Sequence, residues 1–125
     1  MKVNHKLVLT LLVGVGLGAA AVQGLHAQAK PKAYLVSESE VLDAAALASY
    51  TAAIVAVQKA AGGRSFGTRG KIVASVGDAP KRVGISEWDS LEQVQAYLNS
   101  EARKKLVQGG KVVKITRQYI VEAGN

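Results

Sequence analysis

Cysteine is missing from this 125-residue sequence, and histidine and methionine are almost missing. Both histidines, His5 and His26, and the single methionine, Met1, fall within the first 29 residues. The rest of the chain therefore contains no thiol, imidazole or thioether. That composition excludes a cysteine or histidine nucleophile, a histidine general base, a zinc site of the usual ligand type and haem bound through histidine or methionine. We accordingly expect no metal and no cofactor.

Acidic and aromatic residues are also scarce. The chain has nine Asp and Glu against 16 Lys and Arg, and Lys2 and Lys6 lie before residue 30, so residues 30–125 carry a net charge of 14 minus 9, or +5. One interpretation is affinity for an acidic partner such as anionic lipid or nucleic acid, and the other is solubility. We favour solubility and expect no nucleic-acid partner, because only residues 103–105 cluster basic side chains and aromatic stacking platforms are few.

The first 29 residues have the pattern of a secretory signal peptide. A short basic start is followed by an apolar run over residues 7–22, and Ala27-Gln28-Ala29 fits the small-x-small cleavage pattern. An uncleaved anchor is the alternative, but the run is shorter than the roughly 20 residues that span a bilayer. We predict cleavage after Ala29, no stable membrane anchor afterwards, a single domain over residues 30–125, and a periplasmic or secreted location.

The first half of that domain predicts a strand and a helix. Residues 33–41 alternate in polarity as a half-buried strand does. Asp43 is an expected N-cap for the helix that follows, and Gly62-Gly63 is expected to end it. The helix would bury a single apolar stripe, formed by Leu47, Tyr50, Ile54, Val57 and Ala61.

The second half predicts two strands, a helix and a last strand. Residues 66–76 and 82–88 are expected to form a hairpin around the turn residues 77–80. Asp89-Ser90 opens a second helix, in which Ser90 and Gln93 have capping-box spacing. Its inward stripe comprises Leu91, Val94, Leu98 and Ala102, and after the break at Gly109-Gly110 residues 115–122 form the final strand.

This order, β-α-β-β-α-β, predicts an α+β, ferredoxin-like fold with a four-stranded antiparallel sheet. Two helices cover only one face of such a sheet. The other face must be solvated or covered by a second copy, so we expect a homodimer.

Short segments spread over residues 33–124 resemble one bacterial family, called domain of unknown function 1330. The segments are Gly62-Gly63-Arg64, Arg69-Gly70-Lys71, residues 80–83, residues 87–92, residues 96–100 and residues 117–124. The resemblance implies pairing as a dimeric α/β barrel, and it implies no activity. Three departures stand out: one extra residue within Ser65-Phe66-Gly67-Thr68, Trp88 in place of a usual Phe, and residues 100–103 in place of Ser-Pro-x-Tyr.

The glycine-rich stretch over residues 60–73, AAGGRSFGTRGKIV, is not a phosphate loop. A P-loop ending at Gly70-Lys71 would need glycine at Ser65 and Ser or Thr at Ile72. The stretch also follows a helix, and phosphate is bound at helix N-termini. Arg64 either interacts favourably with the helix C-terminus or binds a ligand carboxylate at the rim of a cleft.

Six residues are ligand-binding candidates: Arg64, Arg82, Glu87, Trp88, Arg117 and Tyr119. Glu87 lies in an apolar strand, where burial would raise its pKa and suit it to acid-base chemistry. Alternatively it reaches solvent or pairs with Arg117. Arg117 and Tyr119 share a face of the last strand and would line a polar pocket together with Arg82, Ser86 and Trp88, although a one-residue register error reverses every side chain.

Two functions remain open at this point. The first is a small-molecule-binding module whose small organic ligand enters a cleft between the sheet and the helices. The second is a cofactor-independent enzyme that uses Glu87, Tyr119 or an arginine for acid-base or oxyanion chemistry. A basic envelope protein that binds anionic polymers is a weaker third possibility.

Overall fold

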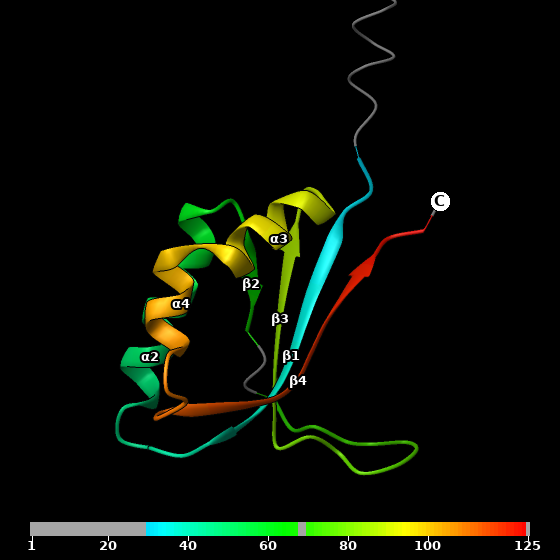
Figure 1. Ribbon diagram of the computed structural model, residues 1–125. Coiled ribbons are helices and arrows are strands. Elements are labelled where there is room, and N and C mark those ends of the chain that lie inside the picture. The colour runs from blue at the N-terminus through cyan, green and yellow to red at the C-terminus, as the bar shows by residue number, and fades with distance from the viewer. Residues whose placement is uncertain (1–29, 68–69, 125) are drawn as a thin grey trace, which may run out of the picture.

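The computed structural model describes residues 30–67 and 70–124 (Figure 1). The predicted signal peptide, residues 1–29, lies outside this part of the chain. The elements are β1 (Ala33–Val41), α2 (Leu47–Ala60), β2 (Arg64–Phe66), β3 (Arg82–Trp88), α3 (Leu91–Asn99), α4 (Glu101–Val107) and β4 (Val113–Glu122).

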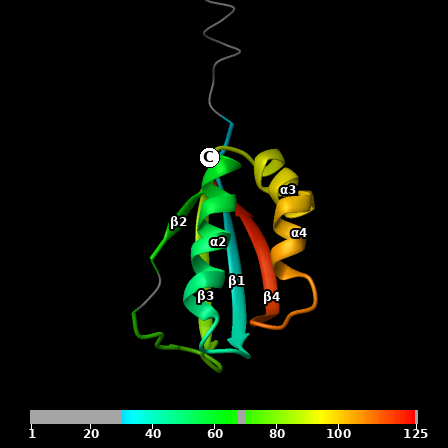
Figure 2. The same ribbon diagram turned by 90° about the vertical axis from the view of Figure 1, so that its left-hand side faces the viewer.

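The four strands form one antiparallel sheet in the order β2-β3-β1-β4. The helices α2, α3 and α4 all cover the same face of this sheet, as the view from the helix side shows (Figure 2). The other face carries no helix, and we call it the open face (Figure 1). The predicted α+β class, the four-stranded antiparallel sheet and the ferredoxin-like strand order are therefore present.

Strands β1 and β3 have the predicted bounds, because their alternation is clear. On β1, Ala33 and Leu35 are buried beneath the helices, and Tyr34 and Val36 lie on the open face. The antiparallel register pairs Leu35 with Ser86 and Val36 with Ile85. Every second residue of β3 therefore shares a face with its partner on β1.

Strand β2 differs from the prediction. It covers only Arg64–Phe66 instead of residues 66–76. Its register pairs Phe66 with Ile85, and β3 begins at Arg82, so a strand that ran on to residue 76 would have no partner. Residues 70–80 contain no helix or strand, and they protrude beyond the open face (Figure 1).

The second helix also differs from the prediction, because it is two helices. Ser100 has an extended backbone conformation, so it ends α3 and begins α4. Its Oγ donates to the carbonyl oxygen of Tyr97 (2.7 Å) and accepts from the backbone N–H of Arg103 (3.3 Å). The capping residue Ser90 was predicted correctly, since its Oγ accepts from the N–H of Gln93 (3.2 Å).

The start of α2 is a smaller correction. Asp43 accepts from the N–H of Ala46 (3.1 Å) in a turn, and the N-cap is Ala46, which has no side-chain cap. The helix ends as predicted, with Gly62 at a positive φ of 94° and the N–H of Gly63 bound to the carbonyl of Gln58. The last strand, β4, begins two residues before its predicted start.

The hydrophobic core lies at one end of the layer between sheet and helices. Five buried residues form it: Ala33, Leu35, Trp88, Val94 and Tyr97. The rings of Trp88 and Tyr97 stack with their centroids 4.8 Å apart. Gly63 packs directly against Trp88 and leaves no room for a side chain, because a Cβ at this position would come within 2.5 Å of the indole ring. Among residues 30–67 and 70–124, no helix is long and apolar enough to cross a bilayer.

Candidate functional site: a polar cavity between the sheet and the helices

The other end of the same layer is hollow. A partly open cavity of about 1010 Å³ lies between the sheet and helices α2 and α4. Its floor is formed by small residues of the two central strands: Ser37, Ser39, Gly84 and Ser86. These side chains are too short to fill the space below α2, so the sequence of the floor itself creates the cavity.

The wall facing this floor combines apolar and polar side chains. From α2 come Leu47, Tyr50, Thr51 and Ile54, while Val107 belongs to α4. The predicted apolar stripe of α2 is thus divided, because its first half lines the cavity and Val57 and Ala61 pack against the core.

Arg82 reaches across the cavity from β3. Its Nη1 donates to Ser39 Oγ on the floor and its Nη2 to Thr51 Oγ1 on α2, each at 3.3 Å. The guanidinium therefore links the two layers through neutral oxygen acceptors.

Arg103 enters the cavity from α4. Its Nη2 donates to Gln118 Oε1 on β4 (3.1 Å), and Gln118 Nε2 donates to Ser37 Oγ on β1 (2.7 Å). Because Ser100 begins α4 afresh, Arg103 lies in its first turn and faces inward.

Two tyrosines, Tyr50 and Tyr97, also line the cavity, as do Gln58 and Ser65. Burial raises the pKa of Tyr50, and the positive charges of Arg103 and Arg82 oppose that rise. Burial also raises the pKa of Tyr97, against hydrogen bonds to Gln58 and Arg103. Both phenols therefore stay protonated at neutral pH and serve as hydrogen-bond donors.

The six candidate residues do not come together in one pocket. Arg82 lines the cavity, and Trp88 belongs to the core, where its Nε1 donates to Ser86 Oγ (2.9 Å). Arg117 and Tyr119 lie on the open face, opposite Glu38 and Val36 of β1. The prediction of a shared pocket was wrong, because the register turns Gln118, between these two residues, towards the helices.

Glu87 is also on the open face, and its environment is the reverse of the prediction. Lys32 Nζ lies 2.9 Å from its carboxylate, and Arg64 forms a second ion pair with it. These two cations hold the pKa of Glu87 below its ordinary value of 4.5 instead of raising it. The carboxylate is therefore ionised at neutral pH and is unsuited to donate a proton.

The two remaining arginines of the open face, Arg64 and Arg117, already have carboxylate partners. Arg64 also lies 3.9 Å from Asp89. Arg117 pairs with Glu38, not with Glu87, and its guanidinium carbon lies 5.5 Å from the centre of the Tyr119 ring.

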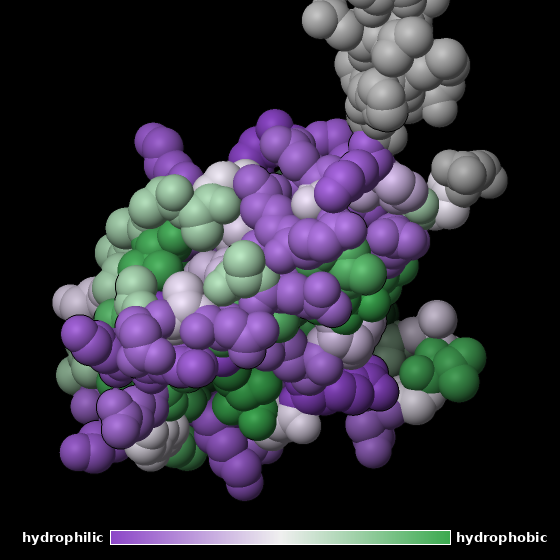
Figure 3. Space-filling model, turned by 45° about the horizontal axis from the view of Figure 1, so that its top comes forward, coloured by the Kyte–Doolittle hydropathy of each residue, from purple (hydrophilic) through white to green (hydrophobic). Residues whose placement is uncertain are grey.

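Hydrophilic side chains predominate over the end of the molecule nearest the start of β1 (Figure 3).

Sequence reasoning missed most polar residues of the cavity, among them Tyr50, Arg103 and Gln118. Tyr50 was counted as core, because its apolar ring fits the helical stripe. Arg103 was counted as part of a solvated basic run. The available signals were the Ser100-x-x-Arg103 spacing, which starts a new helix, and the serines at alternate positions of residues 33–41.

No cluster of three possible metal ligands occurs in the described part of the chain. The cavity lining instead carries hydroxyl, amide and guanidinium groups, which are able to form hydrogen bonds.

The fold is that of an α+β protein of ferredoxin-like strand order, with a partly open cavity of mixed polar and apolar lining between the sheet and the helices. The chain belongs to the family described as domain of unknown function 1330 (DUF1330), which matches residues 32–123. The predicted family is thereby confirmed.

Two solved structures share this fold. A protein of unknown function from Rhodopseudomonas palustris, RPA0582, is 13% identical with a TM-score of 0.54, over 83% of this chain and 90% of that chain. The structure of methylated RPA0582 is 12% identical with a TM-score of 0.56, over 85% and 90% of the two chains. At such low sequence identity, the similarity shows a shared fold and nothing more. No curated protein matches the chain.

Proposed function

We propose that this protein is a small-molecule-binding module whose ligand occupies the cavity between the sheet and the helices α2 and α4. The observation that carries this proposal is the cavity itself, which has about 1010 Å³ of space and a lining of both polar and apolar side chains. Ligand sites in proteins typically enclose roughly 300–1,000 Å³ and combine an apolar lining with a few placed polar groups.

The enzymatic alternative has less support. Glu87 and Tyr119, the residues it would use, lie on the open face, away from the cavity. Within the described residues, the cavity lining holds tyrosines and arginines as its only titratable groups. A general base works best with a pKa near the working pH. The pKa of both tyrosines is raised, and arginine stays protonated.

We further propose that the open face pairs with a second copy of the chain, to give a homodimer of the dimeric α/β-barrel type. One row across the four strands, Phe66, Ile85, Val36 and Tyr119, is apolar or aromatic. Phe66 and Tyr119 expose 48% and 42% of their surface. The loop that protrudes beyond this face (Figure 1) adds two exposed valines, Val73 and Val76. Hydrophobic surface in such a contiguous band favours association.

Export of the protein to the periplasm or the outside of the cell is part of the same proposal, and the sequence of residues 1–29 is its basis. N-terminal sequencing of protein recovered from the cell envelope is expected to begin at Lys30. Recovery of the full chain, beginning at Met1, would contradict this expectation.

The ligand proposal is tested by native mass spectrometry of protein purified under mild conditions from its own envelope. We expect an added mass of a few hundred daltons or less that is lost on activation of the ion in the gas phase. A matched control replaces Gly84 of the floor with Leu, which fills the cavity. If the variant folds and retains the same added mass, the ligand binds elsewhere and the proposal fails.

A further inference from the structure

We infer that the cavity takes a small organic carboxylate with an apolar body, whose carboxyl group is bound by Arg82 and Arg103. This inference rests on the proposed function and deepens it, since it gives the chemical class of the ligand.

The charge of the lining is the first reason. Among the described residues that line the cavity, Arg82 and Arg103 are charged and none is Asp or Glu. Within the same part of the chain, neither arginine has a carboxylate within 4.0 Å. Their partners are the neutral oxygens of Ser39, Thr51, Gln118 and Tyr97. Two uncompensated positive charges in a partly enclosed space are costly, and a bound anion offsets that cost.

Spare hydrogen-bond donors are the second reason. A guanidinium has five N–H groups in a planar fork that matches the two oxygens of a carboxylate. Arg82 uses one N–H of each terminal nitrogen for Ser39 and Thr51, and Arg103 uses Nη2 for Gln118. Both side chains are held in place by these bonds and retain free N–H groups for a ligand.

The two arginines are anchored close together on the cavity floor, although they come from β3 and α4. Arg82 donates to Ser39, and Arg103 is linked through Gln118 to Ser37, which lies two positions away on the same face of β1. Tyr50 lines the same cavity. A carboxylate near the Tyr50 hydroxyl would therefore lie within reach of a phenol donor and of two positive charges. Such charge-assisted hydrogen bonds are roughly twice as strong as neutral ones.

The apolar side chains of the lining indicate that the rest of the ligand is apolar. The walls beside the arginines are formed by Leu47, Ile54, Val107 and Ile115. An inorganic anion would leave these walls without contact. An aliphatic or aromatic acid would bury its apolar body against them and gain the hydrophobic contribution of that surface.

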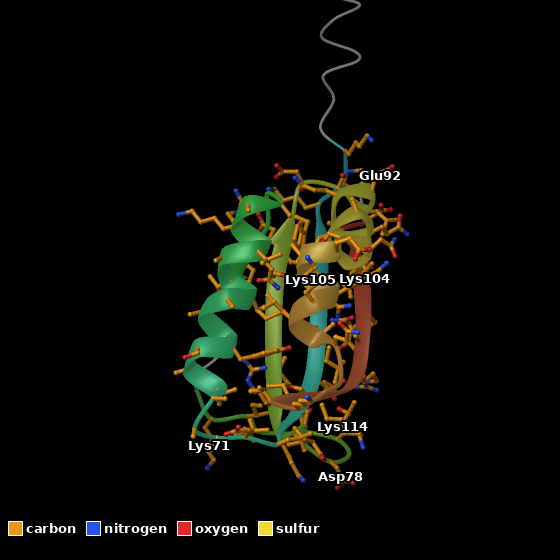
Figure 4. All side chains as sticks on the ribbon, turned by 60° about the vertical axis from the view of Figure 1, so that its left-hand side comes forward. Lys71, Asp78, Glu92, Lys104, Lys105 and Lys114 are labelled. Atoms are coloured by element: carbon orange, nitrogen blue, oxygen red, sulfur yellow. The ribbon has the colours of Figure 1, made fainter. Side chains whose placement is uncertain are left out.

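Basic side chains on the outer surface near the cavity also favour an anionic ligand. Lys104 and Lys105 follow Arg103 on α4, at the middle of the molecule, and the acidic side chains of Glu92 and Asp78 lie towards its two opposite ends (Figure 4). Lys104 is partly compensated by Glu101, at 3.8 Å, and no ion pair is found for Lys105 among the described residues. A net positive charge beside a cavity raises the rate at which anions enter it.

The inference is tested by calorimetric titration of the purified protein, stripped of any ligand, with octanoate, phenylacetate, their uncharged amides, octylamine and phenyl phosphate. We expect each carboxylate to bind at least tenfold more tightly than its amide, since a charged hydrogen bond contributes about 1.5–3 kcal/mol, which converts to roughly tenfold or more in Kd. Arg82→Gln and Arg103→Gln are each expected to remove most of this preference, without weakening the amides.

Lys104→Gln is the matched control, because it removes the same charge from the outer surface of the same helix. It should leave the carboxylate preference within about twofold of the wild type, a shift that corresponds to salt-screened surface electrostatics. Arg103→Lys keeps the charge and loses the fork, so it is expected to bind the carboxylates with intermediate affinity. Thermal unfolding of each variant confirms that it is folded.

The outcomes separate the inference from the proposed function. If acids and amides bind equally, the cavity binds small molecules but does not select carboxylates, and only the inference fails. If octylamine or phenyl phosphate binds more tightly than the carboxylates, the ligand class is wrong. If none of the probes binds, the inference fails, and native mass spectrometry of the envelope-purified protein decides the proposed function independently.

Discussion

Glu87 shows at the scale of a single residue how the ion pairs of the open face depend on pH. The carboxylate has Lys32 and Arg64 as partners, and these cations lower its pKa below 4.5. A group with a lowered pKa in the folded state contributes stability above its ordinary pKa and loses it as the pH falls through the lowered value. The contribution of Glu87 is therefore present at neutral pH and disappears in acid.

We predict that Glu87→Gln lowers the melting temperature at pH 7 and that the difference from wild type shrinks steadily below pH 4.5. Circular dichroism melts between pH 7 and pH 3 measure both effects. Glu122→Gln, at an exposed position of β4 with no ion pair among the described residues, serves as the control and should show little difference at any pH. A Glu87→Gln effect of equal size at pH 7 and pH 3 would contradict the assigned ion pairs.

Gly63 is a second residue whose identity the packing requires. An added Cβ would lie within 2.5 Å of the buried ring of Trp88, which cannot move away without disturbing its stack on Tyr97. We predict that Gly63→Ala destabilises the protein by about 1–3 kcal/mol, as overpacking does in other cores. For a domain of this size that corresponds to a fall of roughly 4–8 °C in Tm per kcal/mol.

Gly67→Ala is the control for this substitution. Gly67 has no atom within 4 Å of the position that its Cβ would take, and its φ is not positive. Thermal melts should show no loss of stability for Gly67→Ala. Equal melting temperatures for Gly63→Ala and the wild type would contradict the predicted clash between the added Cβ and the indole ring of Trp88.

At the scale of the element, Ser100 divides the second helical segment into α3 and α4, because it caps both helices. One hydroxyl ends α3 through the carbonyl of Tyr97 and begins α4 through the N–H of Arg103. The same residue thus supports the stacked core ring of Tyr97 and the placement of the cavity arginine.

We predict that Ser100→Ala costs about 1 kcal/mol of folding free energy, the typical value for a lost helix cap. Because Arg103 lies in the first turn of α4, carboxylate affinity should fall as well. Ser49→Ala, at an exposed position of α2, is the matched control and should change neither property. Denaturant melts and calorimetric titration measure the two effects, and an unchanged melt for Ser100→Ala would rule out its capping role.

Elements with a clear polarity pattern could be predicted from the sequence, and elements defined by pairing could not. Residues 33–41 and 82–88 alternate strongly, so β1 and β3 were placed correctly. The end of β2 depends on where β3 begins and how the two strands register, which no local pattern reports. The division at Ser100 was missed because Leu91, Val94, Leu98 and Ala102 continue a helical spacing across it, although Ala102 is exposed.

At the scale of the whole molecule, the open face leads to a prediction about assembly. Val36 lies at its centre, on β1, between Ile85 and Tyr119. It is half-buried in the single chain, so a lysine there can reach solvent in a monomer. In a dimer the same charge would be buried without a partner, which costs several kcal/mol.

We therefore predict that the wild type is a dimer at micromolar concentration and that Val36→Lys weakens its association at least tenfold, about 1.4 kcal/mol or more. Analytical ultracentrifugation measures both. Leu42→Lys introduces the same charge in the loop that leads from β1 to α2 and should leave the dimer intact. A monomeric wild type would refute the proposed pairing, and a dimeric Val36→Lys variant would place the interface elsewhere.

The candidate site shows most clearly where sequence reasoning stops. Alternation along residues 113–122 shows that Arg117 and Tyr119 share a face, and only the pairing with β1 decides which face that is. The six candidates were polar or aromatic residues in apolar surroundings, a reasonable local criterion. Four of them lie on the open face because the register placed them there.

The sequence by itself determined the family, the α+β class, the strand order and the absence of thiol and imidazole chemistry beyond residue 29, because these depend on composition and local periodicity. The tertiary structure alone decided that small residues of β1 and β3 face the helices and leave a cavity, and that Arg82 and Arg103 both line it. Those two arginines are 21 positions apart on a strand and a helix. Their shared place in the cavity lining follows from strand register and helix packing, which are properties of the folded chain as a whole.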